Sequence, residues 1–280
     1  MSNLPAQHHR LNTHARHLQK TLTALLWTAR FRWSTPSIID GELLGGNGLV
    51  RRMIEKGLLV EHPINNVFAP VRYYTTLSKE GLAMLHRHWA DIVHGLHGTI
   101  AASLASAWAP PTRPEHRIRE AQFEHDLQVQ IGLARSFRSK AQLDRILLAE
   151  DIERVRPAER PAKIPDIIIE GRTGDGSPVK VWGEVEYSRK NQREIDRFCA
   201  FYRDALANGN DRRFDRVVVN CHASVLQQWR RDFARTVIPK WHFRNATRDW
   251  TRLQPKDWHH FPEITAEQVD AIFLPLPSDS

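Results

Sequence analysis

Cysteine is scarce in this sequence, with only Cys199 and Cys221 present. Because there is no C-x-x-C pair, a zinc finger or zinc ribbon is improbable, and a disulfide framework has no support. No apolar stretch reaches the roughly 20 residues that a membrane helix needs. The polar start, "MSNLPAQHHRLNTHARHLQK", also lacks the apolar core of a signal peptide. These absences favour a protein of the reducing cytoplasm with no membrane segment.

Basic residues are in excess: 40 Lys and Arg stand against 32 Asp and Glu, which gives a formal net charge of +8 and a pI near 9.8. This balance favours a polyanionic partner, most plausibly nucleic acid. Hydrophobic residues make up 41% of the 280 residues, enough to bury a core. A chain of this length favours two domains of ordinary size.

The first part of the chain has the pattern of a small helical unit with a β-ribbon. Apolar residues recur at helical spacing in "LQKTLTALLWTARF", and "STPSIIDGELLG" and "LVRRMIEKGLLV" predict two more short helices. Two strands then surround a polar loop containing Asn65 and Asn66, and a further helix begins at Ser78. Helix, helix, helix, ribbon, helix is the order of a winged helix-turn-helix.

The third predicted helix carries the candidate DNA contacts. Leu49 and Met53 are expected to face inward, while Arg51, Arg52 and Lys56 face outward. In a winged helix this helix can enter the major groove of double-stranded DNA. Two alternatives remain: the three cations can be ordinary solvated charges, and winged helices also bind proteins.

A proline-rich stretch at Pro110, Pro111 and Pro114 predicts a boundary between domains. After it, the apolar pattern predicts the order α, β, β, β, α, β, α, which is typical of a two-layer or three-layer α/β domain with a mixed sheet. We therefore predict a mixed α/β protein with a flexible lead (1–17), a winged helix (18–109), a linker (110–116) and an α/β domain (117–280).

Three acids mark the candidate site of the second domain. Asp166 precedes one apolar strand, and Glu184 and Glu186 close the next. In an antiparallel pair these strand ends can meet, and residues 184 and 186 share one strand face. Carboxylates gathered in this way can bind Mg²⁺ or Mn²⁺ and act on a phosphodiester. The alternative is that they are only the polar face of a hairpin.

These acids resemble the PD-(D/E)xK nuclease core. Pro165-Asp166 matches the PD, and Glu184-Val185-Glu186 stands at the (D/E)-x-K position. The sequence departs from that pattern at Glu186, where the motif has lysine. Lys190 or Lys180 are the candidates to replace it. The resemblance implies a restriction-endonuclease-like fold for the second domain, with Asp166, Glu184 and Glu186 as metal ligands.

Two further segments extend the resemblance. "FEHDLQV" at 123–129 and "EVEYSR" at 184–189 are similar to the replication-relaxation family, which joins a winged helix to a nuclease-like domain. That family is similar to the MOB-C class of plasmid mobilisation relaxases. The resemblance covers roughly Leu18 to Cys221 and implies supporting roles at Glu124, His125 and Lys190. Residues 223–280 contain no motif that we can place.

The resemblance implies a metal-dependent DNA-nicking enzyme of plasmid mobilisation or conjugation. Its partners would be double-stranded DNA at a transfer origin and other mobilisation proteins. Tyr187 is the nearest tyrosine if a covalent step exists, although a packing role is the simpler interpretation. The relaxase class with a His-hydrophobic-His site is disfavoured, because His86-Arg87-His88 has the wrong middle residue.

Two other functions remain open. The absence of lysine at position 186 also suits a DNA-binding regulator or relaxosome accessory protein whose nuclease domain has lost activity. A restriction-type or transposition-type endonuclease with the same core is the third hypothesis, and double-strand cuts would favour it.

Overall fold

The computed structural model describes residues 13–64, 71–115, 122–138, 142–154, 163–206, 214–245 and 247–276. The chain forms two compact units, Met1–Arg119 and Glu120–Ser280. The division lies just beyond the predicted linker. The first helix already begins at Thr13, within the predicted lead of residues 1–17. The predicted loop residues Asn65 and Asn66 lie outside the described residues.

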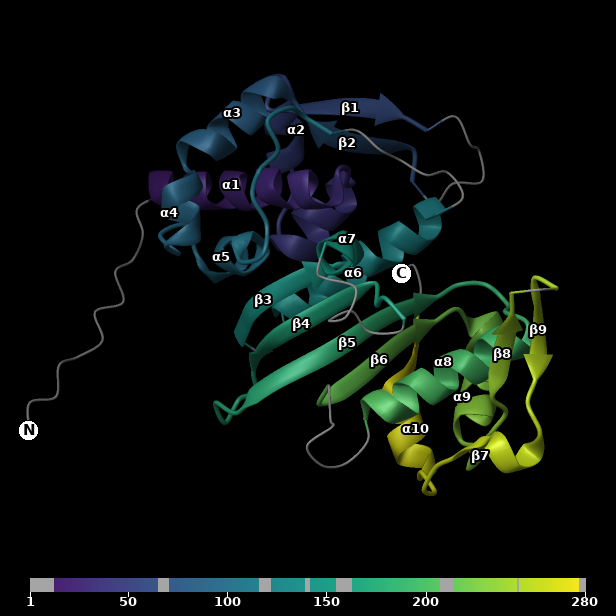
Figure 1. Cartoon of the computed structure of the whole chain (residues 1–280). Helices are drawn as coiled ribbons and strands as arrows, with labels where there is room; N and C mark the ends of the chain where they lie inside the picture. The colour runs from purple at the N-terminus through teal and green to yellow at the C-terminus, as the bar shows by residue number, and fades with distance from the viewer. Residues whose placement is uncertain are drawn as a thin grey trace, which may run out of the picture. The chain divides into compact units, whose positions relative to one another are not determined.

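The first unit consists of helices and one small ribbon at their edge (Figure 1). Its second helical segment, η1, is a seven-residue π-helix that follows Pro36. The elements are α1 (Thr13–Phe31), η1 (Ser37–Leu43), α2 (Leu49–Glu55), β1 (Leu59–Pro63), β2 (Tyr73–Leu77), α3 (Lys79–Arg87), α4 (Trp89–Val93) and α5 (Thr99–Ala105).

The apolar stripe of α1 forms the centre of this unit: Leu22, Leu25 and Leu26 are fully buried. Strands β1 and β2 are antiparallel, and a single bridge between Ser34 and Thr75 extends the ribbon. The helix pattern of the sequence is therefore present, in the predicted order with the ribbon between α2 and α3.

The second unit contains a larger set of elements. They are α6 (Phe123–Arg138), β3 (Gln142–Leu148), α7 (Ala149–Glu153), β4 (Ile167–Arg172), β5 (Pro178–Glu186), α8 (Gln192–Ala205), β6 (Arg216–Cys221), α9 (Ala223–Phe233), β7 (Val237–Ile238), β8 (Trp241–Arg244), β9 (Asp249–Arg252), η4 (Pro255–Asp257), β10 (His259–His260), α10 (Ala266–Ile272) and β11 (Phe273–Pro275).

A five-stranded mixed sheet organises this unit, in the order β11-β6-β5-β4-β3 (Figure 1). Strands β3, β4 and β5 are antiparallel neighbours, while β5, β6 and β11 run parallel. The predicted mixed α/β class and mixed sheet are confirmed. The sheet also includes β11, which comes from the part of the sequence without a recognisable motif.

Alternation along the strands gives the sheet two different faces. On one face, Trp182 and Val219 join a core built with α8, α9 and α10. On the other face, Val181 and Val218 line a pocket with residues of α6. Among the described residues, no helix is both long enough and apolar enough to span a bilayer.

Candidate functional site

Asp166 and Glu184 come together at the junction of β4 and β5. The antiparallel register pairs Ile167 with Gly183, so the residue before β4 lies beside the end of β5. The backbone N–H of Val185 donates to Asp166 Oδ2 over 2.8 Å, which holds the carboxylate against the strand. Gly183 lets the Ile167 side chain lie close to the backbone of β5, because a Cβ at position 183 would lie 2.5 Å from Ile167 Cγ2.

His125, in the first turn of α6, is the partner of Asp166. Its Nε2 lies 3.1 Å from Asp166 Oδ2, and its Nδ1 lies 3.1 Å from Asp126 Oδ1. Burial favours the neutral ring, but the hydrogen bonds and charges of the two aspartates prevail and raise the pKa of His125 to about 10. Burial likewise opposes the Asp166 carboxylate, yet His125, Lys163 and the Val185 N–H lower its pKa.

Glu184 is almost fully buried, with 3% of its surface exposed, and both of its oxygens are bonded. Trp182 Nε1 donates to Oε1 over 2.6 Å, and Lys163 Nζ lies 2.5 Å from Oε2. Desolvation raises the pKa of Glu184 to about 8, although the Lys163 ammonium pulls it down. A carboxyl group that titrates near neutral pH is suited to proton transfer.

Lys163 is the functional candidate that the sequence analysis missed. Its ammonium lies 3.2 Å from the Tyr202 hydroxyl, 4.4 Å from the Phe198 ring centroid and 4.0 Å from Glu186 Oε1. It precedes Asp166 by three residues, in the same short segment before β4. The signal in the sequence was a lysine two residues before the PD pair. Its contact with Glu184 could not be predicted, because it depends on the path of the chain beside β5.

Glu186 is also buried, and its partner is Lys190, whose Nζ lies 3.0 Å from Glu186 Oε2. Desolvation raises the pKa of Glu186, while Lys163 and Lys190 oppose the change. Lys190 directly precedes Asn191, the N-cap of α8, which forms a capping box with Glu194 and fixes the start of the helix.

Lys180 does not lie at this site, so its proposed role as the replacement lysine is wrong. In the β4–β5 register it stands opposite Glu170, and its Nζ lies 3.0 Å from Glu170 Oε1. Glu124 is exposed on α6, one residue from His125. The Tyr187 ring packs 4.9 Å from the His222 ring, which supports the packing alternative.

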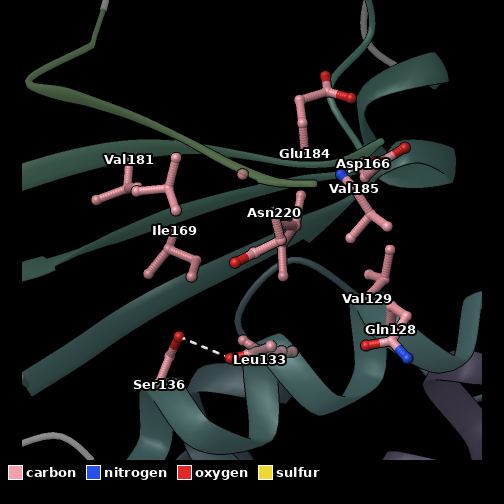
Figure 2. Close-up of a pocket in the computed structure, with 14 residues that line it drawn as sticks. Gln128, Val129, Leu133, Ser136, Asp166, Ile169, Val181, Glu184, Val185 and Asn220 are labelled. Carbon is pink, nitrogen blue, oxygen red and sulfur yellow. Dashed lines mark hydrogen bonds between the residues drawn. The ribbon is translucent and has the colours of Figure 1, made fainter. Parts of the chain in front are cut away.

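A pocket of about 100 Å³ lies between α6 and the sheet, with Asp166 and Glu184 among its lining residues (Figure 2). Gln128 and Ser136 of α6 and Asn220 of β6 supply polar groups to an otherwise largely apolar wall. Figure 2 shows the Glu184 side chain on the opposite side of the sheet from α6. The Asp166 carboxylate contacts His125 of α6 and the backbone of β5.

By donor type the three acids fit a hard divalent cation, which prefers carboxylate oxygens. Each acid is, however, already close to a cation of the protein: His125, Lys163 or Lys190. Within the described part of the chain, the one group of three metal-ligating side chains with atoms within 4.8 Å of one another lies elsewhere, in the first unit.

The predicted DNA contacts of the first unit lie on α2 and the residue after it. Arg51, Arg52 and Lys56 are all exposed, while Leu49 and Met53 are buried as the helical pattern requires. Arg51 Nε lies 3.1 Å from Glu55 Oε1 in a surface ion pair. Such a pair is worth little, so Arg51 can exchange its partner for a phosphate at small cost.

Comparisons of the chain with protein-family models, with curated proteins and with solved structures each gave no match.

Proposed function

We propose that this protein is a metal-dependent DNA-nicking enzyme of the relaxase kind, acting in plasmid mobilisation or conjugative transfer. The single observation that carries the proposal is the set Asp166, Glu184 and Lys163 at the end of two adjacent antiparallel strands. The element order α6-β3-β4-β5-α8-β6 agrees with the nuclease core that the sequence resembles, apart from the short α7.

The basic first unit supports the same proposal. It has three helical segments followed by an antiparallel two-stranded ribbon, with an isolated bridge between Ser34 and Thr75. This agrees with a winged helix, in which α2 presents Arg51, Arg52 and Lys56 to duplex DNA. The second unit would then act on one strand of the bound DNA.

The residues of the site have separable roles in such a reaction. Asp166, with Glu184 and Glu186, would hold Mg²⁺ or Mn²⁺, which orients water and stabilises charge on the phosphate when bound. Lys163 places a buried ammonium beside these acids, where it can stabilise negative charge that develops on a phosphate oxygen. His125 stays protonated at neutral pH and keeps Asp166 ionised and fixed in position.

A second candidate function has its own observation. Because all three acids are paired with protein cations, the site is also stable as a structural ion-pair network. That favours a DNA-binding regulator or relaxosome accessory protein without catalysis, which remains the alternative.

A cleavage assay distinguishes the two. Supercoiled plasmids carrying a library of random inserts and transfer origins are incubated with Mg²⁺ or Mn²⁺, and strand ends are sequenced. We expect nicks from the wild type and from Glu170→Ala, an acid on β4 that pairs with Lys180 away from Asp166. Asp166→Ala should leave the plasmid intact while still binding it. Binding by the wild type without any nick would favour the accessory protein.

A further inference from the structure

We propose a second, separate metal site in the first unit, formed by His88, Asp91 and His97 and suited to Zn²⁺. The three side chains bring one ligand atom each within 4.8 Å of one another. His88 Nδ1 and His97 Nε2 both face Asp91 Oδ2, at 3.9 Å and 3.8 Å. The site does not depend on the proposed nuclease function.

The distances agree better with metal ligands than with direct hydrogen bonds. A hydrogen bond between nitrogen and oxygen ends near 3.2 Å, so neither histidine makes a good one to Asp91. Two ligands of a tetrahedral Zn²⁺, each bound at about 2.1 Å, are separated by about 3.4 Å. The two gaps to Asp91 Oδ2 exceed that separation by about 0.4 to 0.5 Å.

One ligand atom is buried without a hydrogen-bond partner among the described residues. This atom is His97 Nε2, which is removed from solvent. A buried polar atom left unpaired carries a free-energy cost, which a bound cation would offset. Asp91 is half exposed, so water can reach the open side of the site and complete the coordination.

The backbone brings the ligands together within ten residues. His88 and Asp91 are three positions apart at α4 and so share one face of its first turn. The helix then ends in a Schellman motif: Leu96 N–H donates to Asp91 O, and Gly95 N–H to Ile92 O. Gly95 adopts the required left-handed conformation, with φ 76°, and the turn carries the chain back to place His97 over α4.

The ligand set determines the class of metal. Two imidazoles and one carboxylate favour a borderline ion such as Zn²⁺ over Mg²⁺, which prefers oxygen ligands alone. A bound metal ion would hold the turn between α4 and α5 in one conformation. Helix α5 in turn packs on α1, the central helix of the unit. We therefore assign the site a stabilising role in the first unit.

The test uses the full, untagged chain, because other histidines also bind zinc weakly. Zn²⁺ is titrated against a chelating dye, and Co²⁺ spectra report the coordination geometry. We expect the wild type to bind one more Zn²⁺ equivalent than His97→Ala or Asp91→Asn. The affinity of this site for Zn²⁺ should fall at least about tenfold in either variant. His94→Ala, an exposed histidine that caps the same helix, is the matched control and should behave as the wild type.

Thermal melting with and without Zn²⁺ gives the second readout. Zn²⁺ should raise the Tm of the wild type and of His94→Ala, and leave that of Asp91→Asn unchanged. Asp91 is half exposed, so this variant should fold as the wild type does in EDTA. The proposal would be overturned if the wild type and Asp91→Asn bound the same number of Zn²⁺ ions. It would also be overturned if His94→Ala lost as much Zn²⁺ binding as Asp91→Asn.

Discussion

Lys163 Nζ lies 2.5 Å from Glu184 Oε2, and the two side chains are 13% and 3% exposed. A buried pair of this kind is a weak source of net stability, because both charges lose hydration. Removal of one partner is different, since it leaves the other buried polar group without its hydrogen-bond partner. The pair is therefore a sensitive point for experiments on both stability and function.

We predict that Lys163→Met destabilises the second unit by about 2 kcal/mol, because the buried Glu184 carboxyl loses the hydrogen-bond partner of its Oε2. Lys163→Met combined with Glu184→Gln should recover much of that loss, because the glutamine keeps an acceptor for Trp182 Nε1 without a charge. Urea denaturation of the wild type, both single variants and the double variant measures the coupling. Additive effects of the two substitutions would show that the pair is not coupled.

The proposed function makes a separate prediction about the lysines. Lys163→Met should abolish nicking while DNA binding is retained, because the ammonium beside Glu184 is lost. Lys180→Met is the matched control: it removes a lysine of β5 that pairs with Glu170, and it should nick at the wild-type rate. Lys190→Met should give a partial loss through Glu186. If only Lys190→Met were inactive, Lys190 rather than Lys163 would be the lysine that stabilises charge on the phosphate.

The pH dependence of stability should reveal the state of His125. Its pKa is about 10 in the folded chain, against an ordinary value of 6.5. A raised pKa means that the stabilising contribution is complete below pH 6.5 and is lost as the pH rises toward 10. Asp126 and Asp166 are the charged groups that bond the ring.

Unfolding free energies of the wild type and His125→Gln, measured from pH 6 to pH 10, should thus converge as the pH rises. Glu184 also has a raised pKa in the folded chain, so it too loses stabilising free energy as the pH rises. Both proteins share that loss, and it cancels in the difference between their two curves. NMR titration of the ring provides the direct check: Asp166→Asn should lower the pKa of His125 while leaving the Asp126 contact. A wild-type ring that titrates near pH 6.5 would contradict the ion pair.

Part of this site was predictable from the sequence, and the reason is local. The apolar run after Asp166 and the one before Glu184 predict adjacent strands, and a tight turn forces them to be antiparallel, which brings the two acids together. The helical spacing after Lys190 predicts α8 in the same way. These features depend on periodicities of a few residues, which a sequence displays directly.

Other features depended on contacts that no local pattern encodes. Lys163 reaches Glu184 because the segment before β4 passes beside β5, and this path is set by packing against Phe198 and Tyr202. Strand β11 is only Phe273–Pro275, too short for an alternation signal, yet it pairs with β6 at the edge of the sheet. The prediction that Lys180 could replace the lysine of the motif was wrong because nearness in sequence is not nearness in space. Lys180 shares β5 with Glu184 but lies toward the other end of the strand.

The last prediction concerns DNA binding by the first unit. If Arg51, Arg52 and Lys56 contact phosphates, each contact releases counterions, and the slope of log K against log salt changes by about 0.9 per contact in duplex DNA. The triple alanine variant should therefore bind more weakly and lose up to about 2.7 from that slope. Fluorescence anisotropy with a duplex at several salt concentrations measures both quantities. Lys79→Ala with Arg87→Ala, two exposed cations of α3, is the matched control and should leave the slope near the wild-type value. An equal loss of slope in both variants would mean that the basic charge of the unit acts diffusely, and that α2 is not the element that meets the DNA.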